Sequence, residues 1–263
     1  MPSILRNIKT FLFDMDGTIY LGGNILPGAI ETLEVLEKRG IKYFFLTNNS
    51  SRSSAYYVQK LAKMGIKTRE ENIIISTHSL ITYLKTAGGK KLFVLGTDDL
   101  KNHLKDAGYK IVDDETPDYV VVGFDTGLNY QNLSKATQYV DAGVPYVASH
   151  PDVRCPVEGG RFIPDCGSIL ALIKTATGKE CTMITGKPGR HMVQTVLDLT
   201  GQDPSELAVV GDRLYTDIAL GKNSGITSVL VLSGETCFDD IEKSPYKPDL
   251  VLNGIYELER NLL

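Results

Sequence analysis

Several features are scarce in this sequence of 263 residues, and each scarcity excludes a class of protein. Basic residues are not in excess: 28 Lys and Arg against 32 Asp and Glu give a net charge of −4, which argues against a nucleic-acid partner. No run approaches the ~18 apolar residues that a membrane span requires, so we expect no membrane partner. The apolar stretch at residues 11–13 is interrupted at once by Asp14 and Asp16, so we expect no signal peptide.

Cysteine is scarce as well. The four cysteines, Cys155, Cys166, Cys181 and Cys237, are widely spaced and form no C-x-x-C pair. A disulfide framework or a zinc site is therefore not expected. Free thiols in an acidic chain without an export signal favour a reducing compartment, and we expect the protein to be cytoplasmic.

Strand and helix patterns alternate along both ends of the chain. In the N-terminal part the pattern predicts strands at 10–13 and 41–46 and helices at 27–39 and 53–64. In the C-terminal third it predicts strands at 207–210, 227–232 and 250–252 and helices at 214–222 and from about 256. This order is typical of a doubly wound α/β domain, in which a parallel sheet is covered by helices.

The middle of the chain has strands and helices of its own. Strands are predicted at 91–95, 118–122 and 145–148, and helices at 98–107, 131–142 and 168–177. We therefore expect an inserted α/β domain at 79–184, between the two parts of a core domain at 1–78 and 185–263. Residues 149–168 are expected to form a long irregular loop, and residues 165–168 either contact substrate or cap their own helix.

The most informative motif is residues 13–18, which end the first strand. Asp14 and Asp16 lie two positions apart, so they point to the same side of an extended chain. A carboxylate is ionised at pH 7 and can act as a nucleophile, and a neighbouring acid can donate and accept a proton. Gly17 permits the sharp turn that follows. The alternative interpretation is an ordinary turn.

Three further polar clusters follow strands or precede helices. Thr47, Asn48 and Asn49 offer a hydroxyl, amides and backbone N–H groups that suit a phosphoryl oxygen, or else they cap a helix. Lys187 can neutralise a phosphate, or else it is a solvated lysine in a turn. Pro188 is expected in the first turn of the following helix.

The last cluster is a second acid pair. Asp212 ends a predicted strand, and Asp217 follows about one helical turn later. Carboxylate oxygens suit Mg²⁺, so the pair can supply a ligand and an outer-shell partner. The alternative is a helix-capping Asp with a favourable acid in the first turn.

Taken together, the four clusters resemble motifs one to four of the haloacid dehalogenase (HAD) superfamily in sequence and order. The resemblance is closer to one branch, the NagD and 4-nitrophenylphosphatase group, and covers nearly the whole chain. It rests on residues 14–20, 27–28, 46–50, 186–188 and 211–213. It implies a HAD-like, Rossmannoid core with an inserted α/β cap domain.

The spacing of the motifs agrees with the cap type of that branch. About 138 positions separate Asn49 from Lys187, which leaves room for a cap of the second type. About 31 positions separate Asp16 from Thr47, and a predicted helix uses most of them, so a cap of the first type does not fit there.

The resemblance also implies roles for the site residues. Asp14 is expected to be the nucleophile and Asp16 the general acid and base. The groups expected to hold Mg²⁺ are Asp14, the backbone carbonyl of Asp16 and Asp212, with Asp217 orienting the waters of the metal. The residues expected to bind the phosphate are Thr47, Asn48, Asn49 and Lys187.

We therefore expect a Mg²⁺-dependent phosphatase that hydrolyses small phosphorylated metabolites through an aspartyl-phosphate intermediate. One alternative is a phosphomutase or another phosphotransferase on the same core. A second alternative is a phosphate-binding protein without turnover. Caps of this type often pair, so a homodimer is a further expectation.

Overall fold

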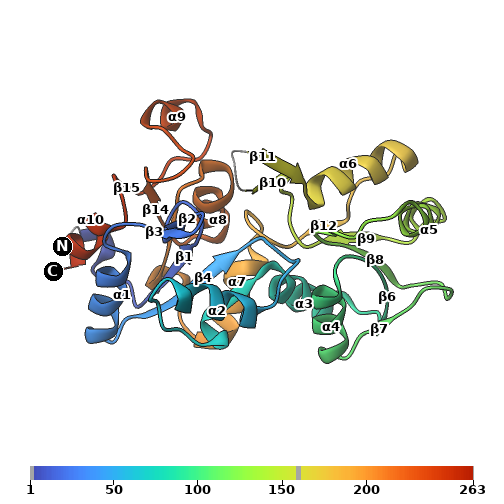
Figure 1. The fold of residues 1–263 in the computed structure, drawn as a ribbon, viewed down its shortest axis with the longest axis horizontal. Coiled ribbons are helices and arrows are strands. Elements are labelled where there is room, and N and C mark those ends of the chain that lie inside the picture. The colour runs from blue at the N-terminus through green and yellow to red at the C-terminus, as the bar shows by residue number, and fades with distance from the viewer. Residues whose placement is uncertain (1–2, 158–160, 263) are drawn as a thin grey trace. The chain divides into compact units, whose positions relative to one another are not determined.

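The structure is a computed structural model that describes residues 3–157 and 161–262 (Figure 1). The chain separates into two compact units. The first unit comprises Met1–Thr47, Ser54–Ile74 and Lys187–Leu263, and the second comprises Asn48–Ser53 and Ile75–Gly186.

The first unit is built on a six-stranded sheet in the order β15-β14-β13-β1-β4-β5. Its strands are β1 (Thr10–Asp14), β4 (Lys42–Thr47), β5 (Ile73–Ile75), β13 (Leu207–Gly211), β14 (Thr227–Val231) and β15 (Leu250–Leu252). The pairs β1–β4, β1–β13, β13–β14 and β14–β15 are all parallel. The expected parallel-sheet core is confirmed.

Helices cover both faces of this sheet because side chains alternate along each strand. Leu12 of β1 belongs to an apolar cluster that also contains Val193 of α7 (His191–Thr200) and Leu220 of α8 (Ala219–Ser224). Phe11 and Phe13 point to the opposite face and stack with ring centroids 5.9 Å apart. Each is fully buried, and burial of such a side chain contributes about 1.5–3 kcal/mol.

The remaining elements of the first unit are shorter or peripheral. They are the helices α1 (Ala29–Lys38), α2 (Ser54–Lys63), α9 (Phe238–Lys243) and α10 (Tyr256–Leu262), the strands β2 (Tyr20–Leu21) and β3 (Asn24–Ile25), and 3₁₀ turns at Ser3–Leu5, Glu70–Asn72 and Pro204–Glu206.

The connections of the first sheet determine where a ligand can bind. The chain runs from β1 outward to β4 and β5 on one side, and later returns to β13 on the other side of β1. The connections therefore diverge between β1 and β13, and ligands of such sheets bind at the carboxyl ends of the strands near this point. Asp14 ends β1 and Asp212 directly follows β13.

The second unit has a parallel five-stranded sheet in the order β12-β9-β8-β6-β7. Its strands are β6 (Lys91–Leu95), β7 (Lys110–Ile111), β8 (Tyr119–Val122), β9 (Tyr146–Ala148) and β12 (Met183–Ile184). Its helices are α3 (Ser76–Ala87), α4 (Asp98–Asp106), α5 (Tyr130–Asp141) and α6 (Cys166–Thr177). Phe93 and Val120 pack with α5 and α6, whereas Leu92 and Val121 pack with α3 and α4. The unit therefore has helices on both faces of its sheet.

The unit boundaries differ from the expected domain boundaries. The expected limit at 78/79 falls inside α3, whereas the first unit ends at Ile74 and resumes at Lys187 instead of 185. The segment Asn48–Ser53 also belongs to the second unit, which the sequence pattern did not indicate. Its residues are held there by bonds such as the one from the Phe124 N–H to Ser50 Oγ, 2.9 Å.

Two local expectations were wrong. Residues 149–168 are not an irregular loop, because β10 (Arg154–Val157) and β11 (Arg161–Pro164) pair antiparallel within them. Pro188 lies in the turn before α7, which begins at His191. The helix expected at 214–222 is observed, with a π-helical turn at Leu214–Ile218 before α8.

Among the described residues, no helix has the length and apolar character that crossing a membrane would require.

Candidate active site

The two acids of the first motif have different environments. Asp14 is the last residue of β1, and its side chain is only 15% exposed, whereas Asp16 is exposed. Gly17 has φ +93° and donates its N–H to the Tyr20 carbonyl at 2.7 Å, so the chain reverses directly after Asp16. The motif therefore places one carboxylate inside the site and one at its edge.

Lys187 joins the buried acids. Its side chain is 5% exposed, and its ammonium group contacts Asp14 Oδ1 and lies 2.8 Å from Asp217 Oδ1. Burial opposes the charge on Lys187, but the two carboxylates outweigh it and hold the pKa of this lysine above its ordinary value. The structure therefore excludes the solvated lysine that the sequence left open.

Asp217 is bound through both of its oxygens. Oδ1 accepts from Lys187, and Oδ2 accepts the backbone N–H of Arg213 at 3.1 Å. A Cβ atom at Gly211 would clash with the Asp217 side chain, so glycine is required at the end of β13. Asp217 therefore positions Lys187, a role that the sequence did not indicate. Its expected role in orienting waters of a metal stays a prediction.

Asp212 has one oxygen that is bound and one that is not. Oδ2 accepts the backbone N–H of Glu235 at 2.7 Å, whereas Oδ1 is buried and has no hydrogen-bond partner. Buried polar atoms are nearly always paired, so an orphaned carboxylate oxygen indicates a place for a ligand. Burial, reinforced by the charge of Asp217, raises the pKa of Asp212 to about 6.

The pKa of Asp14 is raised further than that of Asp212. Burial, followed by the charges of Asp217 and Asp212, raises the pKa of Asp14 to about 8, although Lys187 opposes the shift. The expectation that Asp14 has the ordinary pKa of a carboxylate therefore does not hold for the chain alone. A cation beside Asp14 would favour the ionised form.

The donor set fits a hard divalent cation. One oxygen from each of Asp14, Asp212 and Asp217 lies within 4.8 Å of the others. One ammonium group among three carboxylates leaves an excess of buried negative charge, and all the donors are oxygens, as Mg²⁺ prefers. The orphaned Oδ1 of Asp212 is a ligand atom ready for such an ion.

The phosphate-binding candidates divide between the two units. Thr47 ends β4, directly after the residue paired with Asp14, so it lies at the same edge of the first sheet. Asn48 belongs to the second unit, where its side-chain amide donates to both oxygens of Asp152, at 3.2 and 3.3 Å. In the same unit Asn49 Oδ1 accepts from the N–H and the hydroxyl of Ser51. The first unit thus brings together Asp14, Lys187, Asp212 and Asp217.

The tripeptide Ser233–Gly234–Glu235, which the sequence pattern did not indicate, lies against Asp212 and Gly17. Ser233 and Glu235 follow β14, and Ser233 Oγ donates to the Gly17 carbonyl at 2.7 Å. Like Asp14 and Asp212, these polar residues lie near the carboxyl end of a strand, which is the sequence signal that could have indicated them.

The second unit contains another polar cluster. His150 is fully buried, its Nδ1 lies 2.8 Å from Ser149 Oγ, and its Nε2 lies 2.9 Å from Asp165 Oδ1. Asp165 also caps α6 by accepting the Cys166 N–H at 2.6 Å, so the capping alternative for this residue is observed. Burial raises the pKa of the Cys166 thiol, which makes it an inert core residue.

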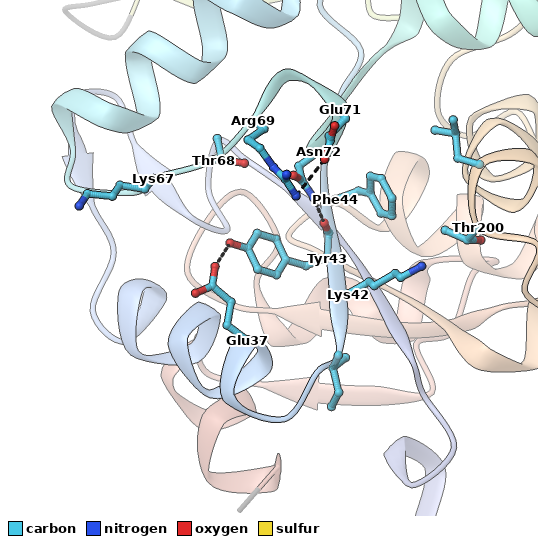
Figure 2. A pocket seen from close by; sticks show the side chains of 12 residues that line it. Glu37, Lys42, Tyr43, Phe44, Lys67, Thr68, Arg69, Glu71, Asn72 and Thr200 are labelled. Atoms are coloured by element: carbon cyan, nitrogen blue, oxygen red, sulfur yellow. Dashed lines mark hydrogen bonds and ion pairs between the residues drawn. The ribbon is translucent and has the colours of Figure 1, made fainter.

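The first unit also has a pocket of about 560 Å³ at the other end of β4 (Figure 2). It lies beside Lys42, where β4 begins, and its polar side chains bind one another. Tyr43 donates to Glu37 at 2.7 Å, and Arg69 pairs with Glu71 at 2.9 Å. None of the site residues predicted from the sequence lines it.

Comparison with known proteins agrees with the geometry. Residues 11–110 match the model of the haloacid dehalogenase-like hydrolases, and residues 184–258 match a second HAD-hydrolase-like model. An acid sugar phosphatase of Staphylococcus haemolyticus is 32% identical over 262 residues, which are 98% of this chain and 99% of the relative.

Solved structures give the same result. A 4-nitrophenylphosphatase from Thermotoga maritima is 41% identical with a TM-score of 0.93, and the match covers 99% of both chains. A glycerol phosphate phosphatase from Mycobacterium tuberculosis, solved in complex with magnesium, is 29% identical with a TM-score of 0.89, over 99% of this chain and 79% of that one.

The chain therefore belongs to the haloacid dehalogenase-like hydrolases. Within this family it falls in the branch of the NagD and 4-nitrophenylphosphatase enzymes, as its motifs predicted, and it is a phosphoric monoester hydrolase.

Proposed function

We propose that this protein is a Mg²⁺-dependent phosphatase that hydrolyses small phosphomonoesters through a phosphorylated Asp14. The observation that carries the proposal is the buried group of Asp14, Lys187 and Asp212, in which one oxygen of Asp212 has no partner. An arrangement of buried charges that is incomplete without a cation and an anionic substrate supports catalysis more than folding.

In the first step, an oxygen of Asp14 forms a bond to phosphorus as the bond to the leaving oxygen breaks. Asp16 gives its proton to that oxygen, which leaves as an alcohol. Lys187, held by Asp217, offsets the repulsion between the carboxylate and the phosphate. Thr47 and the backbone N–H groups of Asn48 and Asn49 bind the phosphoryl oxygens.

In the second step, water replaces Asp14 on phosphorus. Asp16, now ionised, takes a proton from the water, the new oxygen–phosphorus bond forms, and the bond to Asp14 breaks. The exposure of Asp16 supports this role, because both the alcohol and the water reach the site from solvent. Inorganic phosphate leaves, and both acids return to their starting forms.

The residues that would hold Mg²⁺ are Asp14, the backbone carbonyl of Asp16 and Asp212. The ion would lower the pKa of Asp14 and neutralise charge on the phosphate. Asp217 would orient the waters of the ion while it holds Lys187. The magnesium complex of the glycerol phosphate phosphatase relative supports this choice of metal.

The second unit, as the cap, would choose among leaving groups, because Asp14, Asp16, Lys187 and Asp212, which are assigned to the transfer of the phosphoryl group, lie in the first unit. The names of the relatives favour small phosphorylated metabolites, sugar and polyol phosphates above all. A homodimer and a cytoplasmic location stay predictions, and light scattering of the purified protein tests the former.

The proposal is tested by phosphate release from a panel of sugar phosphates, glycerol phosphate and 4-nitrophenyl phosphate. We expect EDTA to abolish release and Mg²⁺ to restore it. Full activity of metal-free protein would contradict the proposal. An added sugar phosphate tests the phosphotransferase alternative, because transfer to it without free phosphate would favour that activity.

A further inference from the structure

The loop after β14 lies at the edge of the sheet that carries the acids. β14 pairs with β13 in parallel register, with Leu230 opposite Gly211, so the chain leaving β14 emerges beside Asp212. Residues 233–235 then make contacts with two distant parts of the chain. They bind the carboxylate of Asp212 and the Gly17 carbonyl in the turn after Asp16.

The carboxylate of Asp212 is fixed in direction by this loop. The N–H of Glu235 binds Oδ2 at 2.7 Å, so that Oδ1 is the oxygen of this carboxylate without a hydrogen-bond partner. A Cβ atom at Gly234 would clash with the carboxylate, and a Cβ atom at Gly17 would lie 2.5 Å from Oδ2. The carboxylate of Asp212 thus packs closely against two glycines, and Oδ1 is its oxygen left without a hydrogen-bond partner.

The turn after Asp16 is fixed by the same loop. The Gly17 N–H binds the Tyr20 carbonyl at 2.7 Å, and the Gly17 carbonyl accepts from Ser233 Oγ at 2.7 Å. The carbonyl of Asp16 shares a planar peptide unit with the Gly17 N–H, so its direction is set when Gly17 is held on both sides.

The side chain of Glu235 binds residues that follow Asp212 in the chain. One carboxylate oxygen lies 2.9 Å from Arg213 Nε, and the other accepts the Tyr215 hydroxyl at 2.9 Å. Both partners belong to the chain that directly follows Asp212. The loop therefore binds the acid through its backbone and the neighbours of the acid through its side chain.

We propose that Ser233, Gly234 and Glu235 are positioning residues that aim Asp212 Oδ1 and the Asp16 carbonyl at the Mg²⁺ site, and so set the affinity for the metal. The proposal rests on the proposed function, because it assumes that these two oxygens are ligands. Residues that orient metal ligands typically change metal affinity by 10–100-fold when they are replaced.

The test is Mg²⁺ binding by calorimetry to metal-free protein without substrate, together with kcat at saturating Mg²⁺. Ser233→Ala removes the bond to the Gly17 carbonyl and should weaken Mg²⁺ binding by about tenfold while kcat at saturating metal changes less than about threefold. Ser233→Thr keeps the hydroxyl and should restore binding. Ser205→Ala, an exposed serine in the same unit, is the matched control and should bind as wild type.

Gly234→Ala should weaken binding more than Ser233→Ala, because its Cβ would displace the Asp212 carboxylate. Thermal unfolding of each variant without metal separates a loss of fold from a loss of affinity. The inference is overturned if folded Ser233→Ala binds Mg²⁺ as tightly as wild type while Asp212→Asn does not bind it. If wild type itself binds no Mg²⁺ and is active without it, the proposed function fails as well.

Discussion

The two polar clusters of this protein, one in each unit, differ in how completely their buried groups are satisfied. In the first unit one lysine contacts two of three carboxylates, burial raises the pKa values of Asp14 and Asp212, and one oxygen of Asp212 has no partner. In the second unit Ser50, Ser149, His150 and Asp165 form a continuous chain of bonds that ends on the capped N–H of Cys166. Among the described residues, no buried side-chain oxygen or nitrogen of that chain lacks a partner.

The difference shows how to separate a site of chemistry from a structural network. Both clusters are largely buried, and each offers three side chains whose ligand atoms lie within 4.8 Å of one another. These are Asp14, Asp212 and Asp217 in the first unit, and His150 and Asp165 with the neighbouring Asp152 in the second. Of the two clusters, the one in the first unit has a buried ligand atom without a hydrogen-bond partner, Asp212 Oδ1, which costs stability unless a ligand compensates it. We therefore expect changes in the first cluster to remove activity and changes in the second to remove stability.

The largest expected effect is that of Asp14→Asn, which removes the nucleophile. Turnover should fall by at least about 10⁴-fold on every substrate, as measured by phosphate release. Asp239→Asn, an exposed acid of the same unit, is the control and should leave turnover unchanged. Substantial turnover by Asp14→Asn would mean that the reaction does not pass through this carboxylate.

Asp16→Asn should have the next largest effect. The nucleophile stays and the proton donor is lost, so kcat on an alkyl phosphate should fall by about 10²–10⁴-fold. The loss should be smaller for 4-nitrophenyl phosphate, whose leaving group barely needs a proton. Equal losses on both substrates would contradict the role given to Asp16.

In the second unit, His150→Gln should act on stability. The substitution breaks the bonds to Ser149 and Asp165 in a fully buried position, at a cost of about 1–3 kcal/mol in the free energy of unfolding. Mg²⁺ affinity should stay at the wild-type value. Asp106→Asn, an exposed acid in the same unit, serves as the control. If His150→Gln lost Mg²⁺ binding without losing stability, the second cluster would be a metal site and not a structural network.

A further expected effect concerns pH and the metal-free protein. The folded pKa values of Asp212 and Asp14 are raised from 3.8 to about 6 and about 8, so between pH 4 and 8 the folded state binds more protons than the unfolded state. Stability from these groups therefore falls as pH rises through this window. Urea unfolding at pH 5 and pH 8 should show that decline, and Mg²⁺ or the double variant Asp14→Asn, Asp212→Asn should reduce it. If stability fell equally between pH 5 and pH 8 in the double variant, groups other than Asp14 and Asp212 would cause the fall.

The sequence predicted the residues of the site better than their surroundings. Asp14, Thr47 and Asp212 could be found because each ends or follows a strand of strong apolar pattern, and parallel strands end at one edge. The role of Asp217 as the partner of Lys187 depends on a contact across 30 residues and on a π-helical turn, which no local pattern indicates. The bond from Ser233 to Gly17 spans 216 residues and was equally hidden.

Local composition explains the errors in the fold. The hairpin of β10 and β11 was missed because Pro156 and Pro164 lie within its strands, and proline is unfavourable there. Helix α3 begins with Ser76 and Thr77, which are weak helix formers, so the second unit was expected to begin too late. Neither error affected the predicted position of Asp14 or Asp212, because the hairpin and the start of α3 lie outside β1 and β13.

The central claim is that the unsatisfied cluster, and not the satisfied one, holds the divalent cation. The most direct test is the anomalous scattering from crystals of this protein soaked with Mn²⁺. We predict one strong peak beside Asp14 and Asp212 Oδ1, and none at the side chains of His150, Asp152 and Asp165. A peak at the second cluster, with none beside Asp212, would contradict the account.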